Sequence, residues 1–207
     1  MTLNLKNLLN PKIKPSKMGE FQELQPIEGL EISAVSADLY GDGRDDLTLF
    51  YFKEGANYAM LNTTNSIVSE TINWNQKSNK KSIKALMINT KNANTFTGQQ
   101  GLDSMDEIAK NLSRTLTIRE SKAEDGVDET VKIKDILFAS TGVIGEKFPV
   151  DKINQTIQTL VDKLKDDQNK LIWMKIGSAI MTTDTKPKLA YEEFVVGNKI
   201  IRIAGIA

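Results

Sequence analysis

The pattern of apolar and polar positions divides the chain into short strand-like stretches and longer helical ones. Strand-like stretches, rich in β-branched and aromatic residues, begin at Leu30. Further strands are predicted over residues 47–52, 57–61, 83–89 and 131–138, with a final pair inside 189–206. The stretches on either side of Gly55 are predicted to form a hairpin, and the final pair is predicted to turn at Gly197-Asn198.

Apolar residues at helical spacing predict three helices. The first is expected to begin at a capping box formed by Ser104 and Glu107, the second directly after Pro149, and the third over residues 172–180. The apolar faces of the first two helices consist of Met105, Ile108, Ala109, Leu112 and Leu116, and of Ile153, Ile157, Leu160, Val161 and Leu164. Strands grouped in hairpins and separated by helices predict a layered α+β fold.

Composition narrows the function without assigning one. Lys+Arg 27 and Asp+Glu 27 balance, so no basic excess indicates a nucleic-acid partner. The 207 residues contain no His and no Cys, which excludes Ser-His triads, disulfides and zinc sites built from these residues. No stretch approaches the ~20 apolar residues of a membrane span, and residues 1–18 lack the apolar core of a signal peptide. We therefore expect a cytoplasmic protein with a polar arm over residues 1–18 and a single α+β domain over residues 19–207.

Three polar segments after apolar stretches carry the candidate chemistry. Thr141 and Gly142 come directly after a predicted strand. A threonine hydroxyl and the next backbone N–H can converge on a developing oxyanion, although a Thr-Gly turn is also a common structural element. The Thr-Thr-Asp-Thr run at residues 182–185 has the same two interpretations, since Asp184 can simply brace the turn. The loop at residues 91–98 can line a ligand site or cap the following helix.

One acidic segment has the outline of a calcium loop. Asp38, Asp42 and Asp46 have a suitable spacing. The third loop position, however, is Tyr40, and the twelfth is Leu49 where a calcium loop has Glu. An acidic turn that leads into a strand is therefore favoured, and no metal site is expected.

Considered together, these segments resemble a known family. The shared motifs are Asn92-Ala93-Asn94 with Thr97-Gly98, Ala139 to Gly145, Ile180 to Thr185 with Pro187-Lys188, and Ala204 to Ala207. In this order they resemble the N-terminal, α part of the bifunctional glutamate N-acetyltransferases of arginine biosynthesis, also called ornithine acetyltransferases. The resemblance covers residues 19–207 and is most specific from residue 83 onward; before that, only short matches within residues 43–47 support it.

The resemblance implies a layered α/β/β/α-type sandwich with mixed sheets and flanking helices. It also implies a precursor that cuts itself before a threonine, which becomes the N-terminal nucleophile of a β chain and uses its own α-amine as base. That chemistry needs neither His nor Cys. This chain would be the α chain, paired with the β chain of the same precursor in an α2β2 heterotetramer. Its apolar last residues, 200–207, would continue toward the cleavage site.

The resemblance also assigns roles to individual residues. Thr141 and Gly142 match the oxyanion-hole pair of the family, through a hydroxyl and a backbone N–H respectively. Thr182 matches a substrate-binding residue, with Thr183 as the alternative. The implied ping-pong reaction takes acetyl from N-acetylornithine, releases ornithine and forms N-acetylglutamate from glutamate. No cofactor is implied, although some relatives also accept acetyl-CoA as the donor, and neither nucleic acid nor a membrane is an implied partner.

Two other classes of protein remain open. A self-processing aminopeptidase or amidase of similar architecture would hydrolyse its substrate, and an assay with glutamate as the acyl acceptor separates it from a transferase. A non-catalytic binding module, such as a calcium-stabilised β domain, would be revealed by metal titration. The sequence departs from the family pattern at Phe96, where Cys is usual, and its arm up to Lys17 has no counterpart.

Overall fold

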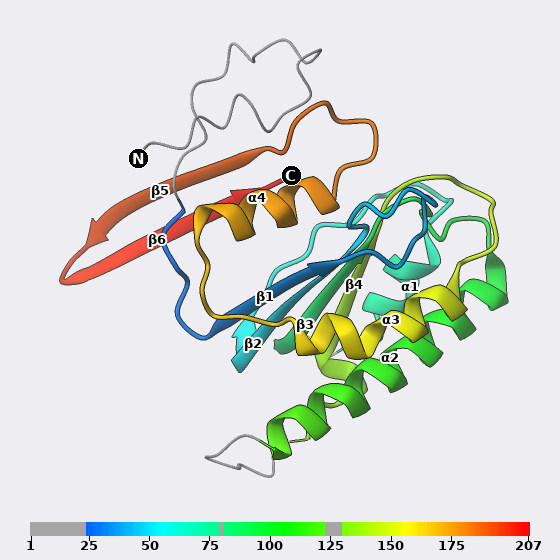
Figure 1. Cartoon of the computed structure of the whole chain (residues 1–207), viewed down its shortest axis with the longest axis horizontal. Coiled ribbons are helices and arrows are strands. Elements are labelled where there is room, and N and C mark those ends of the chain that lie inside the picture. The colour runs from blue at the N-terminus through cyan, green and yellow to red at the C-terminus, as the bar shows by residue number, and fades with distance from the viewer. Residues whose placement is uncertain (1–23, 79–80, 123–129) are drawn as a thin grey trace.

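Four strands form a mixed sheet at the centre of the computed structural model, which describes residues 24–78, 81–122 and 130–207 (Figure 1). The expected arm over residues 1–18 lies outside the described residues. The strands, in spatial order, are β1 Leu30–Val35, β2 Leu47–Asn57, β3 Ser82–Asn89 and β4 Ile136–Ser140. β2 is antiparallel to β1 and to β3, and β4 is parallel to β3. The carboxyl ends of β1, β3 and β4 therefore meet at one end of the sheet.

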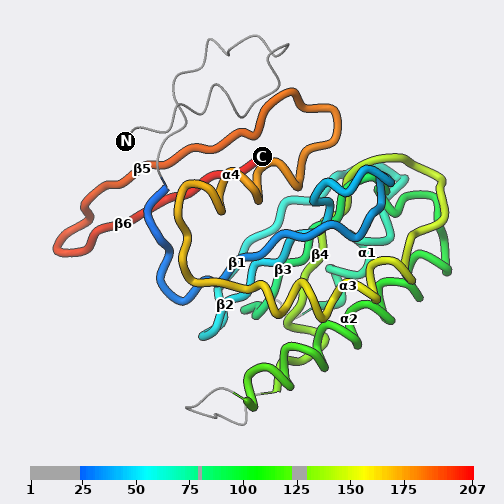
Figure 2. Tube along the Cα trace, viewed as in Figure 1, coloured from blue at the N-terminus to red at the C-terminus, as the bar shows by residue number. Residues whose placement is uncertain are grey.

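Helices cover one face of this sheet, and a helix with a β-hairpin covers the other (Figure 1). The helices are α1 Glu70–Asn75, α2 Gly98–Ser121, α3 Val150–Asp162 and α4 Lys170–Ala179, with a 3₁₀ turn at Ile133–Asp135. The antiparallel hairpin consists of β5 Leu189–Val196 and β6 Lys199–Ile206. Figure 2 shows that β6 brings the end of the chain back beside α4, which lies between the hairpin and the sheet.

Alternate residues of the strands face two separate apolar cores. Leu49 and Tyr51 of β2 pack in the core with α2 and α3, whereas Phe50 between them packs in the core with α4. In the second core the rings of Phe50 and Trp173 lie 6.4 Å apart between centroids. The faces predicted from helical spacing are buried, namely Met105, Ile108, Ala109, Leu112 and Leu116 of α2, and Ile153, Ile157, Leu160 and Val161 of α3.

Both edges of the four-stranded sheet are closed by contacts from elsewhere in the chain. On β4, the Asn75 amide donates to the Phe138 carbonyl (2.7 Å) and accepts from the Phe138 N–H (3.0 Å). On β1, the backbones of Ile32 and Lys165 exchange hydrogen bonds of 3.0 and 3.3 Å. The Gln168 side chain makes three more bonds, of 2.7 to 2.9 Å, to the backbone at the start of β1 and just before it. These contacts satisfy backbone groups that an edge strand otherwise leaves unpaired.

The α+β class with a mixed sheet and flanking helices is confirmed, but the hairpin predicted across Gly55 is wrong. Residues 47–57 form one strand, β2, and its pairing with β3 shifts register between Tyr51 and Ala56. Gly55 has φ +76°, which a glycine adopts without steric cost. The glycine therefore lies in an irregular stretch inside a long strand, where the sequence predicted a turn between two short ones.

The capping box predicted at Ser104 is also wrong. α2 begins earlier, at Gly98, and the Ser104 hydroxyl donates to the Gln100 carbonyl from inside the helix (2.8 Å). The strand predicted over residues 131–138 begins only at Ile136, after the 3₁₀ turn. Within the described ranges, every helix is too short or too polar to cross a membrane.

Candidate functional site

The loops that leave β3 and β4 lie side by side at the end of the sheet where the parallel strands finish. The Val143 N–H donates to the Lys91 carbonyl (2.8 Å), and the Ala93 N–H donates to the Val143 carbonyl (2.9 Å). Farther along, the Gly145 N–H donates to the Thr95 carbonyl (2.9 Å). The parallel pairing of β3 with β4 thus continues into the two loops and fixes the backbone between them.

Thr141 and Gly142 lie at the start of this paired region. The Thr141 N–H donates to the Asn89 carbonyl (3.1 Å), which holds the residue in line with β4. Gly142 has φ +133°, and a Cβ at that position would lie only 2.2 Å from the carbonyl carbon of Lys91. Only glycine fits this contact, because a real Cβ does not approach another heavy atom so closely.

The same geometry leaves two hydrogen-bond donors exposed to solvent. Both Thr141 and Gly142 are exposed. Among the residues that the structure describes, neither the Thr141 hydroxyl nor the Gly142 N–H has a hydrogen-bond partner. Adjacent donors on a rigid turn can hold the negative oxygen of a tetrahedral intermediate.

The Ser140 hydroxyl, in contrast, bonds to neighbouring side chains. It lies 2.8 Å from the Thr71 hydroxyl and donates to Asn89 Oδ1 (2.7 Å). The hydroxyl is therefore engaged by its neighbours, and the donor pair consists of the next two residues alone.

The asparagines of the 91–98 loop brace the backbone instead of lining an open site. The buried Asn92 amide donates to the carbonyls of Glu146 and Lys147, both at 3.2 Å. The buried Asn94 side chain accepts from the Thr97 hydroxyl (2.7 Å) just before α2. The two asparagines therefore brace the backbone. The helix cap that the sequence also allows is not made, since Thr97 at the start of α2 has no side-chain capping bond.

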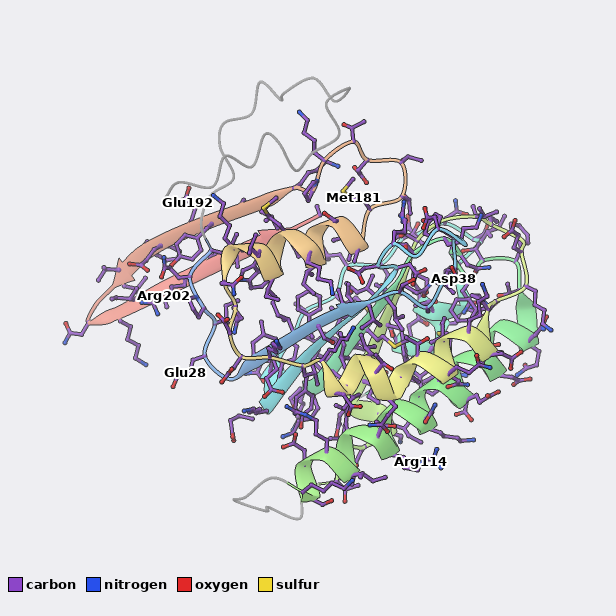
Figure 3. All side chains as sticks on the ribbon, viewed as in Figure 1. Glu28, Asp38, Arg114, Met181, Glu192 and Arg202 are labelled. Carbon is purple, nitrogen blue, oxygen red and sulfur yellow. The ribbon has the colours of Figure 1, made fainter. Side chains whose placement is uncertain are left out.

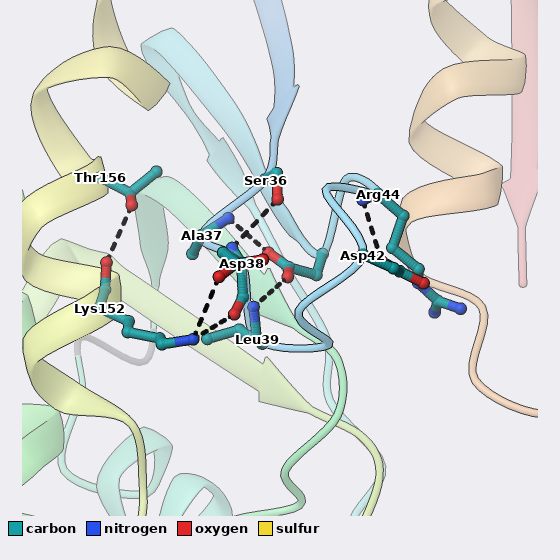
Figure 4. A network of polar contacts seen from close by, with 9 residues as sticks. Ser36, Ala37, Asp38, Leu39, Asp42, Arg44, Lys152 and Thr156 are labelled. Carbon is teal, nitrogen blue, oxygen red and sulfur yellow. Dashed lines mark hydrogen bonds and ion pairs between the residues drawn. The ribbon is translucent and has the colours of Figure 1, made fainter.

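The acidic segment before β2 is a braced turn (Figure 4). The Asp46 carboxylate accepts hydrogen bonds from the N–H groups of Ala37 (2.7 Å) and Leu39 (2.6 Å). Burial raises the pKa of Asp46, while these two N–H groups act in the opposite direction. Asp38 instead faces Lys152, and Asp42 accepts from a backbone N–H. In the described part of the chain, no three His, Cys, Asp or Glu side chains are grouped as a metal site would need.

The loop after α4 contributes the third predicted residue. The half-buried Thr182 lines a pocket of about 190 Å³ together with Arg44, Lys175, Met181 and Asp184. Figure 3 labels Met181, which lies just beyond the end of α4. Thr183 is exposed and is not among the residues that line this pocket. Lys188 pairs with Asp184 and thereby holds the pKa of that carboxyl below its usual value.

An aromatic contact links this pocket to the paired loops. The Arg44 guanidinium carbon lies 3.7 Å from the centroid of the Tyr40 ring, and Lys91 Nζ lies 5.7 Å from the same centroid. The Arg44 side chain also donates to the Met181 carbonyl (2.6 Å). The sequence predicts no functional role for Tyr40 or Arg44, and the short match to the family within residues 43–47 is the signal it offers for Arg44.

The fold of this chain is shared with two solved proteins. The structure superimposes on the ornithine acetyltransferase of Mycobacterium tuberculosis, solved in complex with ornithine, with a TM-score of 0.71 and 24% identity. It also superimposes on the arginine biosynthesis bifunctional protein ArgJ of Bacillus halodurans, with a TM-score of 0.75 and 23% identity. These matches cover 88% and 91% of this chain. The model of the ArgJ family matches residues 31–207, and the chain therefore belongs to the ArgJ family.

Curated relatives are considerably longer than this chain. The arginine biosynthesis bifunctional protein ArgJ of Caulobacter vibrioides is 33% identical over 191 residues, which cover 90% of this chain but 43% of that protein. The chain thus spans less than half the length of this relative. The solved chains from B. halodurans and M. tuberculosis, by contrast, are covered over 93% and 88% of their own lengths.

Proposed function

We propose that this chain is the α part of a two-chain acetyltransferase that moves acetyl from N-acetylornithine to glutamate. The observation that carries the proposal is the pair of exposed donors at Thr141 and Gly142, fixed at the end of β4. Membership of the ArgJ family and the likeness to an ornithine acetyltransferase bound to ornithine support the same reaction. The lengths of the solved chains, close to that of this one, support a division of the whole protein into two chains.

In the proposed reaction, the nucleophile is the N-terminal threonine of a β chain made from the same precursor. Its hydroxyl attacks the acetyl carbonyl of N-acetylornithine, and its α-amine takes the hydroxyl proton and passes it to the departing amine of ornithine. The acetyl group then rests on the threonine as an ester. The α-amine of glutamate attacks that ester, and N-acetylglutamate leaves as the threonine is restored.

The role of this chain is to stabilise charge in both steps. Each step passes through a tetrahedral intermediate with one negative oxygen, and the Thr141 hydroxyl and Gly142 N–H would donate to it. No group in this scheme requires a cofactor, a His or a Cys. Use of acetyl-CoA as an alternative donor, and a cytoplasmic location, stay predictions.

A surface on the hairpin fits the proposed β chain and an α2β2 assembly. Large apolar side chains are exposed on both of its strands, namely Phe194, Val195, Val196, Ile200, Ile201 and Ile203. A concentration of exposed apolar groups of this kind is typical of a surface that another chain covers. The longer relatives contain a further segment that this chain does not match, and in the proposal that segment corresponds to the β chain.

The test is Thr141→Ala in the complete, self-cleaved protein. Removing one oxyanion donor costs about 2.7–4 kcal/mol in comparable sites, so turnover should fall about 10²–10³-fold. Thr141→Ser, which keeps a hydroxyl, should retain most of the rate. Normal turnover in Thr141→Ala would refute the role. Free acetate in place of N-acetylglutamate, with the unaltered protein and excess glutamate, would indicate the hydrolase alternative.

A further inference from the structure

A network of four polar side chains lies next to the exposed donor pair. Three of its members, Thr71, Asn89 and Asn94, are 2% exposed or less, and the fourth, Ser140, is half-buried and directly precedes Thr141. Ser140 Oγ donates to Asn89 Oδ1 (2.7 Å) and lies 2.8 Å from Thr71 Oγ1. Asn94 Nδ2 donates to Thr71 Oγ1 (3.4 Å). This Ser140 network therefore joins α1, the ends of β3 and β4, and the loop before α2.

The Asn89 amide sets the direction of the bonds in the Ser140 network. Asn89 Nδ2 donates to the backbone carbonyls of Asn92 (2.9 Å) and Thr90 (3.2 Å), which leaves Oδ1 to face Ser140. An amide oxygen only accepts hydrogen bonds, and a hydroxyl has one proton to donate. Ser140 donates that proton to Asn89, so in the 2.8 Å contact Thr71 must be the donor and Ser140 the acceptor. Bonds that run in one direction polarise and strengthen one another.

Asn89 also holds the residue that follows Ser140. Its backbone carbonyl accepts from the Thr141 N–H (3.1 Å), while its side chain accepts from the Ser140 hydroxyl. The peptide between Ser140 and Thr141 is thus held by two bonds to a single residue at the end of β3. The backbone that carries the Thr141 hydroxyl and the Gly142 N–H consequently leaves β4 in a fixed orientation.

We propose that Ser140, Asn89 and Thr71 are positioning residues, which act on acyl transfer through the donor pair without touching the substrate. The inference rests on the proposed function, because the orientation of the pair matters to the rate only if the pair holds a developing oxyanion. Donors that are already aimed at a negative oxygen need no reorganisation when that charge forms. Loss of a positioning residue should therefore lower kcat and leave substrate binding unchanged.

The first experiment measures kcat and KM for N-acetylornithine and for glutamate, per molecule of folded and self-cleaved complete protein. Ser140→Ala should lower kcat about 10- to 100-fold with both KM values unchanged, since a misplacement of about 1 Å can reduce a rate about 10²-fold. Thr71→Val keeps the shape without the hydroxyl and should lower kcat about 2- to 12-fold, the equivalent of one neutral hydrogen bond. Thr71→Ser, which keeps the hydroxyl, should retain most of the rate.

Thr115→Val is the matched control for the Thr71 variants. Thr115 is a buried threonine of α2, and its hydroxyl donates to the Asn111 carbonyl (2.9 Å) outside the Ser140 network. The same substitution there should leave kcat and both KM values unchanged. The Thr71 variants also test the inference independently if Ser140→Ala does not fold.

The second experiment combines Ser140→Ala with Thr141→Ala in a double-mutant cycle. Residues that act as a unit have effects on kcat that do not multiply, whereas independent residues have effects that do. If Ser140 acts through the donor pair, Ser140→Ala should lower kcat clearly less in the Thr141→Ala protein than in the unaltered one.

Several results would overturn the inference while leaving the proposed acetyl transfer intact. An unchanged kcat in both Ser140→Ala and Thr71→Val, even with a loss of stability, would assign the Ser140 network to folding alone. An effect on KM alone would place these residues against the substrate. A Thr71→Ser protein as slow as Thr71→Val would exclude the hydroxyl as the cause. Full multiplication of the two effects in the double variant would show that Ser140 acts independently of the pair.

Absence of acetyl transfer in the unaltered protein is a different outcome. It would contradict the proposed function itself, and the inference with it.

Discussion

At the scale of single residues, Gly142 shows how a backbone position can require one amino acid. Its φ of +133° lies in a region that is essentially restricted to glycine, and its α-carbon faces the Lys91 backbone without room for a methyl group. Gly41 has φ +75°, but no heavy atom lies within 4 Å of a Cβ built there. A side chain at Gly41 would therefore cost only the strain of a positive φ, whereas a side chain at Gly142 would also collide with the Lys91 backbone.

Replacing each glycine by alanine should reveal that difference. Gly41→Ala should lower the free energy of unfolding by about 1–2 kcal/mol, the cost of a left-handed conformation for an L-residue. Gly142→Ala should lower it by clearly more, since the loops after β3 and β4 must move apart. Chemical denaturation of both variants measures the comparison. An equal decrease in the free energy of unfolding in both variants would mean that the loops move apart at Gly142 with little energetic cost.

The two threonines after α4 can be distinguished by kinetics. A hydroxyl that binds substrate contributes equally to the ground state and the transition state, so Thr182→Val should raise KM more than it lowers kcat. One neutral hydrogen bond contributes about 0.5–1.5 kcal/mol, or about 2- to 12-fold. Thr183→Val is the matched control, because Thr183 lies outside the pocket. The reverse pattern would assign substrate binding to Thr183.

At the scale of elements, the sequence predicts helices and strands well where burial of one face decides their position. α3, α4 and the β5–β6 hairpin lie where the apolar pattern places them. The failures at Gly55 and Ser104 have a local cause. A glycine suits a bulge as well as a turn, and a serine three residues before a glutamate is a cap only if the helix begins there.

The contact between α1 and β4 is an element-scale feature that leaves no sequence pattern. Asn75→Ala should remove both hydrogen bonds to Phe138 and leave buried backbone groups unpaired, at a cost of about 1–3 kcal/mol for each such group. Asn73→Ala on the same helix should have a much smaller effect, since among the described residues its side-chain amide bonds only to the Glu70 side chain. Urea denaturation compares the two. A loss in Asn75→Ala no larger than that in Asn73→Ala would show that β4 does not depend on this contact.

At the scale of the whole molecule, the sequence identifies the donor pair but not its surroundings. Thr141 and Gly142 follow a strand and match a family motif, so both are visible in the sequence. Arg44 and Met181 are 137 residues apart, and only the folded chain brings them together. The amino-acid composition likewise does not predict which opposite charges pair in a pocket, because the pairing depends on how the chain folds.

The exposed hairpin leads to a prediction for the assembly. In the complete protein, Ile200→Asp should weaken association of this chain with the proposed β chain about tenfold or more, because a large apolar side chain contributes about 1.5–3 kcal/mol when buried. Leu61→Asp is the control, since Leu61 is fully exposed and belongs to the loop between β2 and α1, not to the hairpin. Co-purification of the β chain with each variant, followed by size-exclusion chromatography at several dilutions, measures the effect. Equal retention of the β chain would place the contact elsewhere.

The closure of β1 by Lys165 and Gln168 also has a consequence for how the protein is made. β1 leaves the ribosome well before Gln168, which bonds to Leu30 and is 138 residues later in the chain. At about 5–20 residues per second, translation needs roughly 7–28 s to supply that partner. During this interval the outer edge of β1 is open to strands of neighbouring nascent chains. We therefore expect translation that stalls between residues 35 and 165 to expose this edge to aggregation.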